Sequence, residues 1–186
     1  MYFVRTVITV ILAISSCGCS TFAGDKLLGL VSLDENRDKD QVIHKAEGRV
    51  ERLLDHLDVS QDIRQRYTSL NLLGIVRPGT HNAPDHIAQR LVLISGNGEL
   101  KNVAGSIIVA TGSLKIQSSA NNVIVCNGDL SIGDDSGLSG AGSYSSLLVS
   151  KGRTNLSRGN GTKIYALGGT TITYGHYVQT FGTKSD

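Results

Sequence analysis

The sequence predicts a mainly β protein, a short parallel β-helix or solenoid of about five 16-residue coils, preceded by an amphipathic helical segment. Three observations predict this fold class. Short apolar segments repeat in a fixed phase in the second half of the chain. Glycine is frequent, at 22 of 186 residues, while aromatic residues make up only 5%, which is typical of short strands of small and β-branched residues joined by tight turns. Before the repeat, apolar residues recur at helical spacing.

The repeat is a ten-residue pattern in which place six is glycine, places two and ten are aliphatic, and place four is small. The four clear copies are IIVATGSLKI at 107–116, VIVCNGDLSI at 123–132, LLVSKGRTNL at 147–156 and KIYALGGTTI at 163–172. LVLISGNGEL at 91–100 is a weaker first copy. The glycines from Gly96 to Gly168 step by 16, 16, 24 and 16 residues, so the long step is one coil with an eight-residue insertion rich in Gly, Ser and Asp.

Places two and four share one strand face, and places eight and ten share another, so we expect both pairs to point inward. The glycine between them is expected to supply a left-handed backbone at a sharp corner. A single coil buries too little apolar surface to offset the entropy of ordering it, so coils are stable only when stacked. One buried column should hold Ile108, Ile124, Leu148 and Ile164. The alternative, an antiparallel sandwich of hairpins, would not require identical phase in every copy.

Places one and three should point outward and form an aliphatic ladder. It comprises Ile107, Val109, Val123, Val125, Leu147 and Val149. An exposed apolar strip of this kind needs a cover. We expect the helix at 38–57 to supply that cover, and the alternative is a partner surface occupied by a second protomer or by another envelope protein.

The helical segment carries an apolar stripe at spacings of 3, 4, 3 and 4, formed by Ile43, Ala46, Val50, Leu53 and Leu57. Its two heptads are too few for a coiled coil alone, so packing on the β-domain is expected over oligomerisation. The domain boundaries that follow are 38–76 for the helical segment, 77–90 for a linker that holds both prolines, and 91–186 for the solenoid, with a C-terminal cap from Thr173.

The N-terminus has the pattern of a signal peptide at 1–16, with Arg5 before an apolar run too short to span a bilayer. It ends in Ile14-Ser15-Ser16-Cys17, which resembles the lipobox of bacterial lipoproteins. The resemblance implies that Cys17 carries a diacylglycerol thioether and starts the mature chain, with 17–37 as lipid anchor and tether. Ordinary signal-peptidase cleavage is the alternative.

By the same resemblance, the protein is expected in the bacterial cell envelope, attached to the membrane through its lipid anchor. Gly18 stands where an inner-membrane retention signal often has Asp, which favours the outer membrane, facing the periplasm or the surface. Cys19 and Cys126 remain as thiols, and Cys126 falls at a small, buried place of the repeat. No disulfide framework is implied.

The net charge and the absence of known motifs argue against several classes of function. A formal net charge of +2 without a basic stripe or an aromatic platform argues against nucleic-acid binding. No motif predicts a catalytic site, a metal site or a cofactor. Four residues could form a glycan or ion surface: Asp129, Asp134, Asp135 and Arg153. Asp129 and Arg153 share place seven of neighbouring coils and could form an ion pair, and the Asp134–Asp135 loop is a calcium alternative.

The coils resemble bactofilins, the polymer-forming β-solenoids of bacteria, in their short length and aliphatic-x-x-x-Gly spacing over about 80 residues. The resemblance brings no catalytic residues, and an export signal departs from the cytoskeletal pattern. The function predicted from the sequence is therefore a non-enzymatic envelope lipoprotein, a scaffold, adhesion or assembly module with self-association or an envelope partner. The alternative is a carbohydrate-binding or polysaccharide-lyase-like solenoid.

Overall fold

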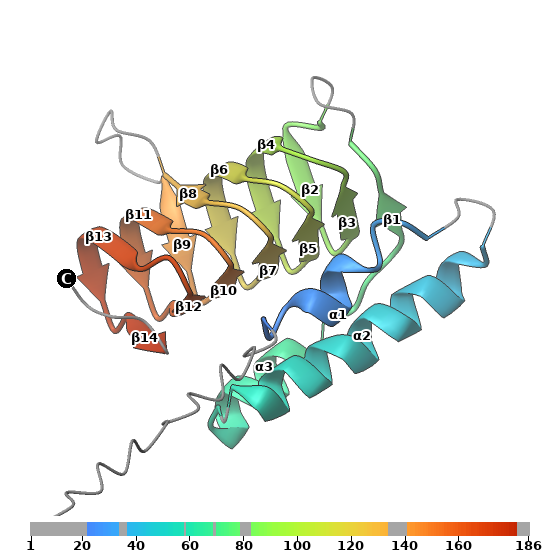
Figure 1. Ribbon diagram of the computed structural model, residues 1–186, viewed down its shortest axis with the longest axis horizontal. Coiled ribbons are helices and arrows are strands. Elements are labelled where there is room, and N and C mark those ends of the chain that lie inside the picture. The colour runs from blue at the N-terminus through green and yellow to red at the C-terminus, as the bar shows by residue number, and fades with distance from the viewer. Residues whose placement is uncertain are drawn as a thin grey trace, which may run out of the picture.

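The computed structural model describes residues 22–33, 37–57, 59–68, 70–78, 83–133 and 141–181. Parallel coils stack into a β-solenoid of about six turns, and three helices lie along one side of it (Figure 1). The predicted fold class is confirmed. All strand pairs are parallel, which excludes the antiparallel sandwich.

The first sheet contains one short strand from every coil, stacked in chain order. Its members are β1 (Ile75–Val76), β3 (Leu91–Ile94), β5 (Ile107–Ala110), β7 (Val123–Cys126), β10 (Leu147–Ser150), β12 (Lys163–Ala166) and β14 (Gln179–Phe181). The register keeps each place of the repeat above itself. Ile108, Ile124, Leu148 and Ile164 therefore form one column, and each is 0% exposed, as predicted.

The second sheet contains the longer strands that close each coil. Its members are β2 (His86–Ala88), β4 (Gly98–Ala104), β6 (Leu114–Ala120), β8 (Leu130–Ile132), β9 (Gly142–Tyr144), β11 (Thr154–Asn160) and β13 (Thr170–His176). In β4 the buried side chains are Leu100 and Val103, and the ladder to β6 omits Lys101, so the strand bends there. Places eight and ten point inward as predicted.

The eight extra residues lie at that same bend. β8 and β9 are two halves of one coil's strand, because both pair with β6 and β11. Ile132 pairs with Ile116, and Gly142 pairs with Ser118 two residues further along β6. Gly133 therefore takes the bend position, and residues 134–141 are the insertion. Because β8 and β9 both keep the register of β6 and β11, the extra residues do not disturb the stack.

Three helices precede the solenoid in the chain and lie along its side: α1 (Asp25–Leu28), α2 (Lys39–His56) and α3 (Gln61–Thr68). The Asp38 side chain caps α2 by accepting a hydrogen bond from the Asp40 N–H at 3.0 Å. The predicted stripe is largely confirmed, since Ala46, Val50 and Leu53 are buried and Ile43 is half-buried. Tyr67 of α3 joins the layer to the solenoid, because its hydroxyl donates to the Ser145 carbonyl at 2.7 Å.

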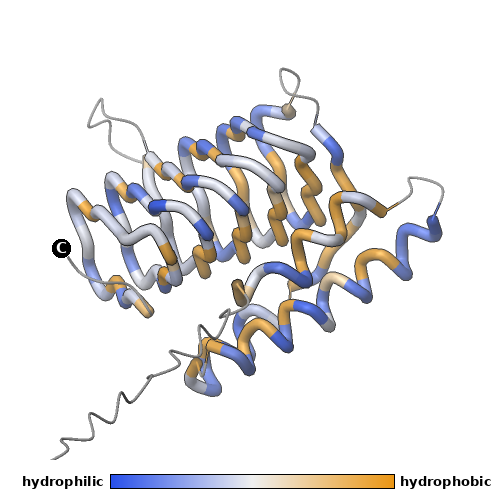
Figure 2. Tube along the Cα trace, in the orientation of Figure 1, coloured by the Kyte–Doolittle hydropathy of each residue, from blue (hydrophilic) through white to orange (hydrophobic). Residues whose placement is uncertain are grey.

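The helices cover the outward ladder of the first sheet. Ile107, Val109, Val123, Val125, Leu147 and Val149 are each at most 1% exposed and share one apolar core with residues of the helices. Figure 2 shows apolar residues along this sheet and along the helices beneath it. The ladder is therefore a buried interface within the chain, and it is not a surface open to a partner.

α1 is the helix that lies directly against β5 and β7, a role that the sequence analysis gave to the helix at 38–57 alone. Phe22, Leu27 and Leu30 are buried in the same core, so residues 22–33 are part of the domain and not a tether. At Gly24 an added Cβ would lie 2.5 Å from a methyl carbon of Val125, which shows how closely the chain approaches the sheet.

The solenoid is longer at both ends than predicted. β1 lies within the predicted helical segment, β2 lies within the predicted linker, and β14 lies within the predicted cap. Each of them continues the 16-residue register, pairing Ile75 with Leu91, His86 with Asn102, and Gln179 with Lys163. The end coils lack the glycine and small-residue pattern, because outer coils stack on one side only.

Of the glycines at place six, Gly96 has the predicted left-handed backbone, with a φ of 84°, whereas the later ones are required for a different reason. Those after Gly96 have no left-handed φ; instead, each donates its N–H to the glycine carbonyl one coil below, at 2.9–3.1 Å. A Cβ on Gly152, for example, would lie 2.7 Å from the carbonyl carbon of Gly128. Left-handed backbone also recurs at the opposite corner, with φ of 47–63° at Gln89, Gly105, Asn121, Ser145, Gly161 and Tyr177.

Candidate functional site

The sequence-predicted site residues fall into three places. Cys17, Asp134 and Asp135 lie outside the described residues. The six residues of the aliphatic ladder are buried beneath the helices, as described above. Asp129 and Arg153 are exposed neighbours at one corner of the solenoid.

Asp129 has a structural contact at that corner. Its Oδ1 accepts a hydrogen bond from the backbone N–H of Arg153, one coil further on, at 2.8 Å. The same pattern occurs in the coils below, where Asn97 Oδ1 accepts from Ser113 N–H at 2.8 Å and Ser113 Oγ accepts from Asp129 N–H at 3.0 Å. Place seven is thus a ladder of side-chain acceptors that satisfies corner N–H groups. Asp129 therefore contacts Arg153 as hypothesised, but through the backbone N–H of Arg153 and not through an ion pair with its side chain.

A second polar ladder lies buried at the opposite corner, and the sequence analysis missed it. Asn122 Oδ1 accepts from the Ser106 N–H at 2.8 Å, and its Nδ2 donates to the Val103 carbonyl at 2.8 Å and to Ser119 Oγ at 2.9 Å. All these groups are internally satisfied, so they stabilise the stack and do not form a binding site. The sequence does contain a pattern that could have predicted this ladder, because a polar residue directly precedes each of four short strands of the first sheet. These residues are Ser106, Asn122, Ser146 and Thr162.

Three exposed tyrosines lie on the later coils of the second sheet or at the corner that follows it. Tyr144, Tyr174 and Tyr177 are 38%, 66% and 83% exposed, in a chain that has only six tyrosines. The Arg158 guanidinium lies over the Tyr174 ring, 5.7 Å from its centroid. We call these three residues the tyrosine patch: Tyr144 lies on β9, Tyr174 on the edge strand β13, and Tyr177 directly after β13.

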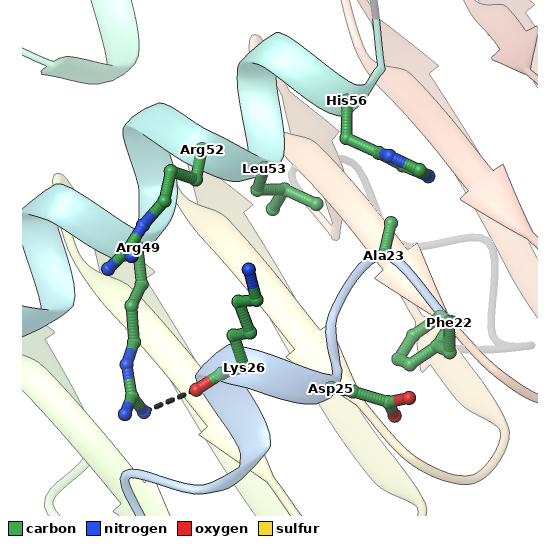
Figure 3. A pocket seen from close by; sticks show the side chains of 8 residues that line it. All are labelled: Phe22, Ala23, Asp25, Lys26, Arg49, Arg52, Leu53 and His56. Atoms are coloured by element: carbon green, nitrogen blue, oxygen red, sulfur yellow. Dashed lines mark hydrogen bonds between the residues drawn. The ribbon is translucent and has the colours of Figure 1, made fainter.

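A groove between α1 and α2 is one concave site of the described residues (Figure 3). It has a volume of about 250 Å³. Its apolar wall is formed by Phe22, Ala23 and Leu53. Its charged lining comprises Asp25 and Lys26 from α1 and Arg49, Arg52 and His56 from α2. We call this site the cationic groove, because three permanent cations face one carboxylate.

Hydrogen bonds to backbone hold the two arginines of the groove. Arg49 Nη1 donates to the Lys26 carbonyl, which ties α2 to the end of α1, and Arg52 Nε donates to the Gly48 carbonyl at 3.1 Å. Burial, with a smaller contribution from the neighbouring Arg52, lowers the pKa of Arg49. Figure 3 shows the Lys26 side chain extending from α1 into the space below Arg52 and Leu53.

None of the ion pairs among the described residues neutralises these cations. The pairs join His44 to Glu47, Arg64 to Asp55, and Lys101 to Asp85. The groove therefore concentrates positive charge on one side of the helical layer. Arg49, Arg52 and His56 are spaced by 3 and 4 residues, so the sequence could have placed them on one helix face. The contribution of Lys26 depends on the packing of α1, which the sequence did not indicate.

Other reactive groups do not form a second site. Burial raises the pKa of the Cys126 thiol to about 12, so this cysteine is a protonated, inert core residue. In the described part of the chain, no group of three or more His, Cys, Asp or Glu side chains could hold a metal ion. No helix within the described ranges is long and apolar enough to cross a membrane.

Comparison with known proteins adds no relative: no family profile, curated protein or solved structure matches this chain. The candidate sites thus stand on their geometry alone. They are the cationic groove, the tyrosine patch and the two ends of the solenoid.

Proposed function

We propose that the protein is a non-enzymatic, lipid-anchored scaffold of the bacterial cell envelope that assembles through the ends of its solenoid. The observation that carries the proposal is that, among the described residues, each sheet ends at both sides in a strand that pairs with only one neighbour. β1 and β14 are the edge strands of the first sheet, and β2 and β13 are those of the second. Open strand edges form further backbone hydrogen bonds readily.

The register fixes how two copies would meet. Ile75 lies one coil before Leu91, and Gln179 lies one coil after Lys163, so both ends keep the 16-residue phase. Stacking the C-terminal end of one copy on the N-terminal end of the next would place Gln179 opposite Ile75 of the next copy. In the second sheet this contact leaves one strand position unfilled, because the chain ends its last coil at β14, and Ala88 of the next copy would lie two coils beyond His176. Such a head-to-tail contact does not close on itself and therefore propagates as a filament.

The last coil has the surface that stacking would bury. Ile172 and Val178 pack against the interior but are only partly buried, whereas Ile164 one coil below is 0% exposed. Another coil on top would complete their burial, as each coil does for its neighbour in the rest of the stack.

The anchor is tested separately from assembly. We predict that Cys17→Ala abolishes metabolic labelling of the protein with a fatty-acid analogue, because Cys17 is the proposed acylated residue. Cys19→Ala is the matched control, two residues away, and should keep full labelling. Equal labelling of the two variants would refute the assignment of the anchor.

Assembly is tested on the protein purified in its natural processed form. Negative-stain microscopy and light scattering should show filaments whose axial repeat matches one solenoid, growing with protein concentration. A strict monomer at all concentrations, with no self-crosslinking in the envelope, contradicts the proposed assembly.

Carbohydrate binding is a second candidate, favoured by the tyrosine patch. Aromatic rings offer apolar faces on which sugar rings stack, and their hydroxyls can hydrogen bond. A glycan array with the native protein and with a Tyr174→Ala, Tyr177→Ala variant tests this candidate, with Asp129→Asn and Arg153→Ala for the corner residues. Binding that is lost in the tyrosine variant supports it, and no binding to any glycan ends it.

A further inference from the structure

The cationic groove lies at the end of the described chain that leads to the proposed anchor. Phe22 forms part of its wall and is five residues from Cys17. Five extended residues span at most roughly 18 Å. An acylated Cys17 would therefore hold the groove within about two Debye lengths of the lipid headgroups, at roughly 8 Å each in physiological salt.

The lining combines the two properties that an anionic lipid requires. Lys26, Arg49 and Arg52 outnumber the single carboxylate of Asp25, which suits a negatively charged group such as a phosphate. Phe22, Ala23 and Leu53 line the same groove and offer apolar contact beside the charges. A free phosphate would use only the cations, whereas a phospholipid would use both parts of the lining.

The arrangement is built into the packing of the two helices. Arg49 is held by its bond to the Lys26 carbonyl, so its guanidinium cannot leave the groove without breaking the contact between α1 and α2. The like charges of Arg49 and Arg52 lie near enough to repel one another, and Asp25 is the single carboxylate of the lining, so a bound anion would relieve that repulsion.

We infer that the cationic groove binds the phosphate of an anionic phospholipid headgroup in the membrane that carries the anchor. The inference rests on the anchoring proposed above, and it adds a function: the lipid fixes the orientation of the solenoid relative to the membrane. Lys26 and Arg52 supply the main charge contacts, and Arg49 positions them by joining the helices.

The test is a titration of the processed protein, in neutral detergent, with water-soluble short-chain phosphatidylglycerol. Short-chain phosphatidylcholine and inorganic phosphate are the comparison probes. We expect saturable binding of phosphatidylglycerol, weakened roughly tenfold by Lys26→Gln and by Arg52→Gln, since each removes one charge-assisted hydrogen bond. Arg49 is left intact because its bond is structural. Unchanged thermal melting of the variants shows that their folding is preserved.

The matched control removes exposed cations from the solenoid, with Lys115→Gln and Lys151→Gln, and should bind like the native protein. Equal weakening by control and groove variants, or equal binding of phosphatidylcholine, overturns the inference. Inorganic phosphate that binds as tightly as phosphatidylglycerol also overturns it, by showing a phosphate site with no lipid component. The titration reports on the groove whether or not Cys17 is acylated, so its failure is distinct from failure of the anchor.

Discussion

At the residue scale, Gly128 shows why the repeat requires glycine. Its φ is not left-handed, yet a Cβ would lie 2.7 Å from the Ser113 nitrogen and 3.0 Å from the Gly112 carbonyl carbon. The periodicity of the sequence identified this position correctly, but the expected reason was wrong. The distance between backbones of stacked coils is a property of the assembled stack, and no local pattern reports it.

We predict that Gly128→Ala lowers the free energy of unfolding by about 1–3 kcal/mol, because the methyl group meets backbone atoms that the stack holds in place. Gly48→Ala in α2 is the matched control, since nothing lies within 4 Å of its added Cβ. It should raise the stability by about 1 kcal/mol through better helix propensity. Chemical denaturation measures both, and equal effects of the two substitutions would contradict the close-stacking explanation.

At the element scale, the helices convert an aliphatic ladder into a second apolar core. The sequence predicted α2 and its buried stripe because 18 residues of regular spacing give a clear signal. It missed α1, whose four residues from Asp25 to Leu28 show no periodicity and form a helix only because tertiary packing holds them. The sequence correctly predicted that a helix covers the ladder. Because it did not predict α1, which forms one wall of the cationic groove, it could not predict the groove.

We expect Leu54→Ala to destabilise the protein by about 2–5 kcal/mol, because Leu54 is 0% exposed in the core shared by helices and sheet. Leu73→Ala is the control at a leucine that is 61% exposed, and it should change stability by less than about 0.5 kcal/mol. Thermal unfolding monitored by circular dichroism provides the comparison. A mild effect of Leu54→Ala would show that the helical layer contributes little to the fold.

At the scale of the whole molecule, the 16-residue phase runs from β1 to β14 and is interrupted only by the insertion. The central coils were predictable because each is packed on two sides and so requires the same residues at the same places. The end coils were not, because one-sided packing relaxes those requirements. The groove and the tyrosine patch were also missed, since each joins residues from elements whose relative placement only the fold determines.

Deleting residues 134–141 should leave the fold intact, because Gly133 and Gly142 then become adjacent bend residues, as Lys101 and Asn102 are in β4. We expect a change in unfolding free energy within about 1 kcal/mol, in line with the small entropy of loop closure. Deleting 107–114 also removes eight residues but shifts the phase of every later coil, and it should abolish cooperative unfolding. If the two deletions are tolerated equally, the coils do not depend on a common register.

Disulfide trapping of the head-to-tail contact is the most direct test of the central claim, that the solenoid ends pair in phase. The variant carries Gln179→Cys and Ile75→Cys, residues of the two edge strands of the first sheet that occupy the same place of the repeat at opposite ends of the stack. Oxidation in the cell envelope should yield a ladder of covalent dimers, trimers and longer chains on non-reducing gels. The pair Gln179→Cys with Lys101→Cys, in which Lys101 belongs to the other sheet and is out of phase, should remain monomeric. A ladder in both variants, or in neither, would contradict the account.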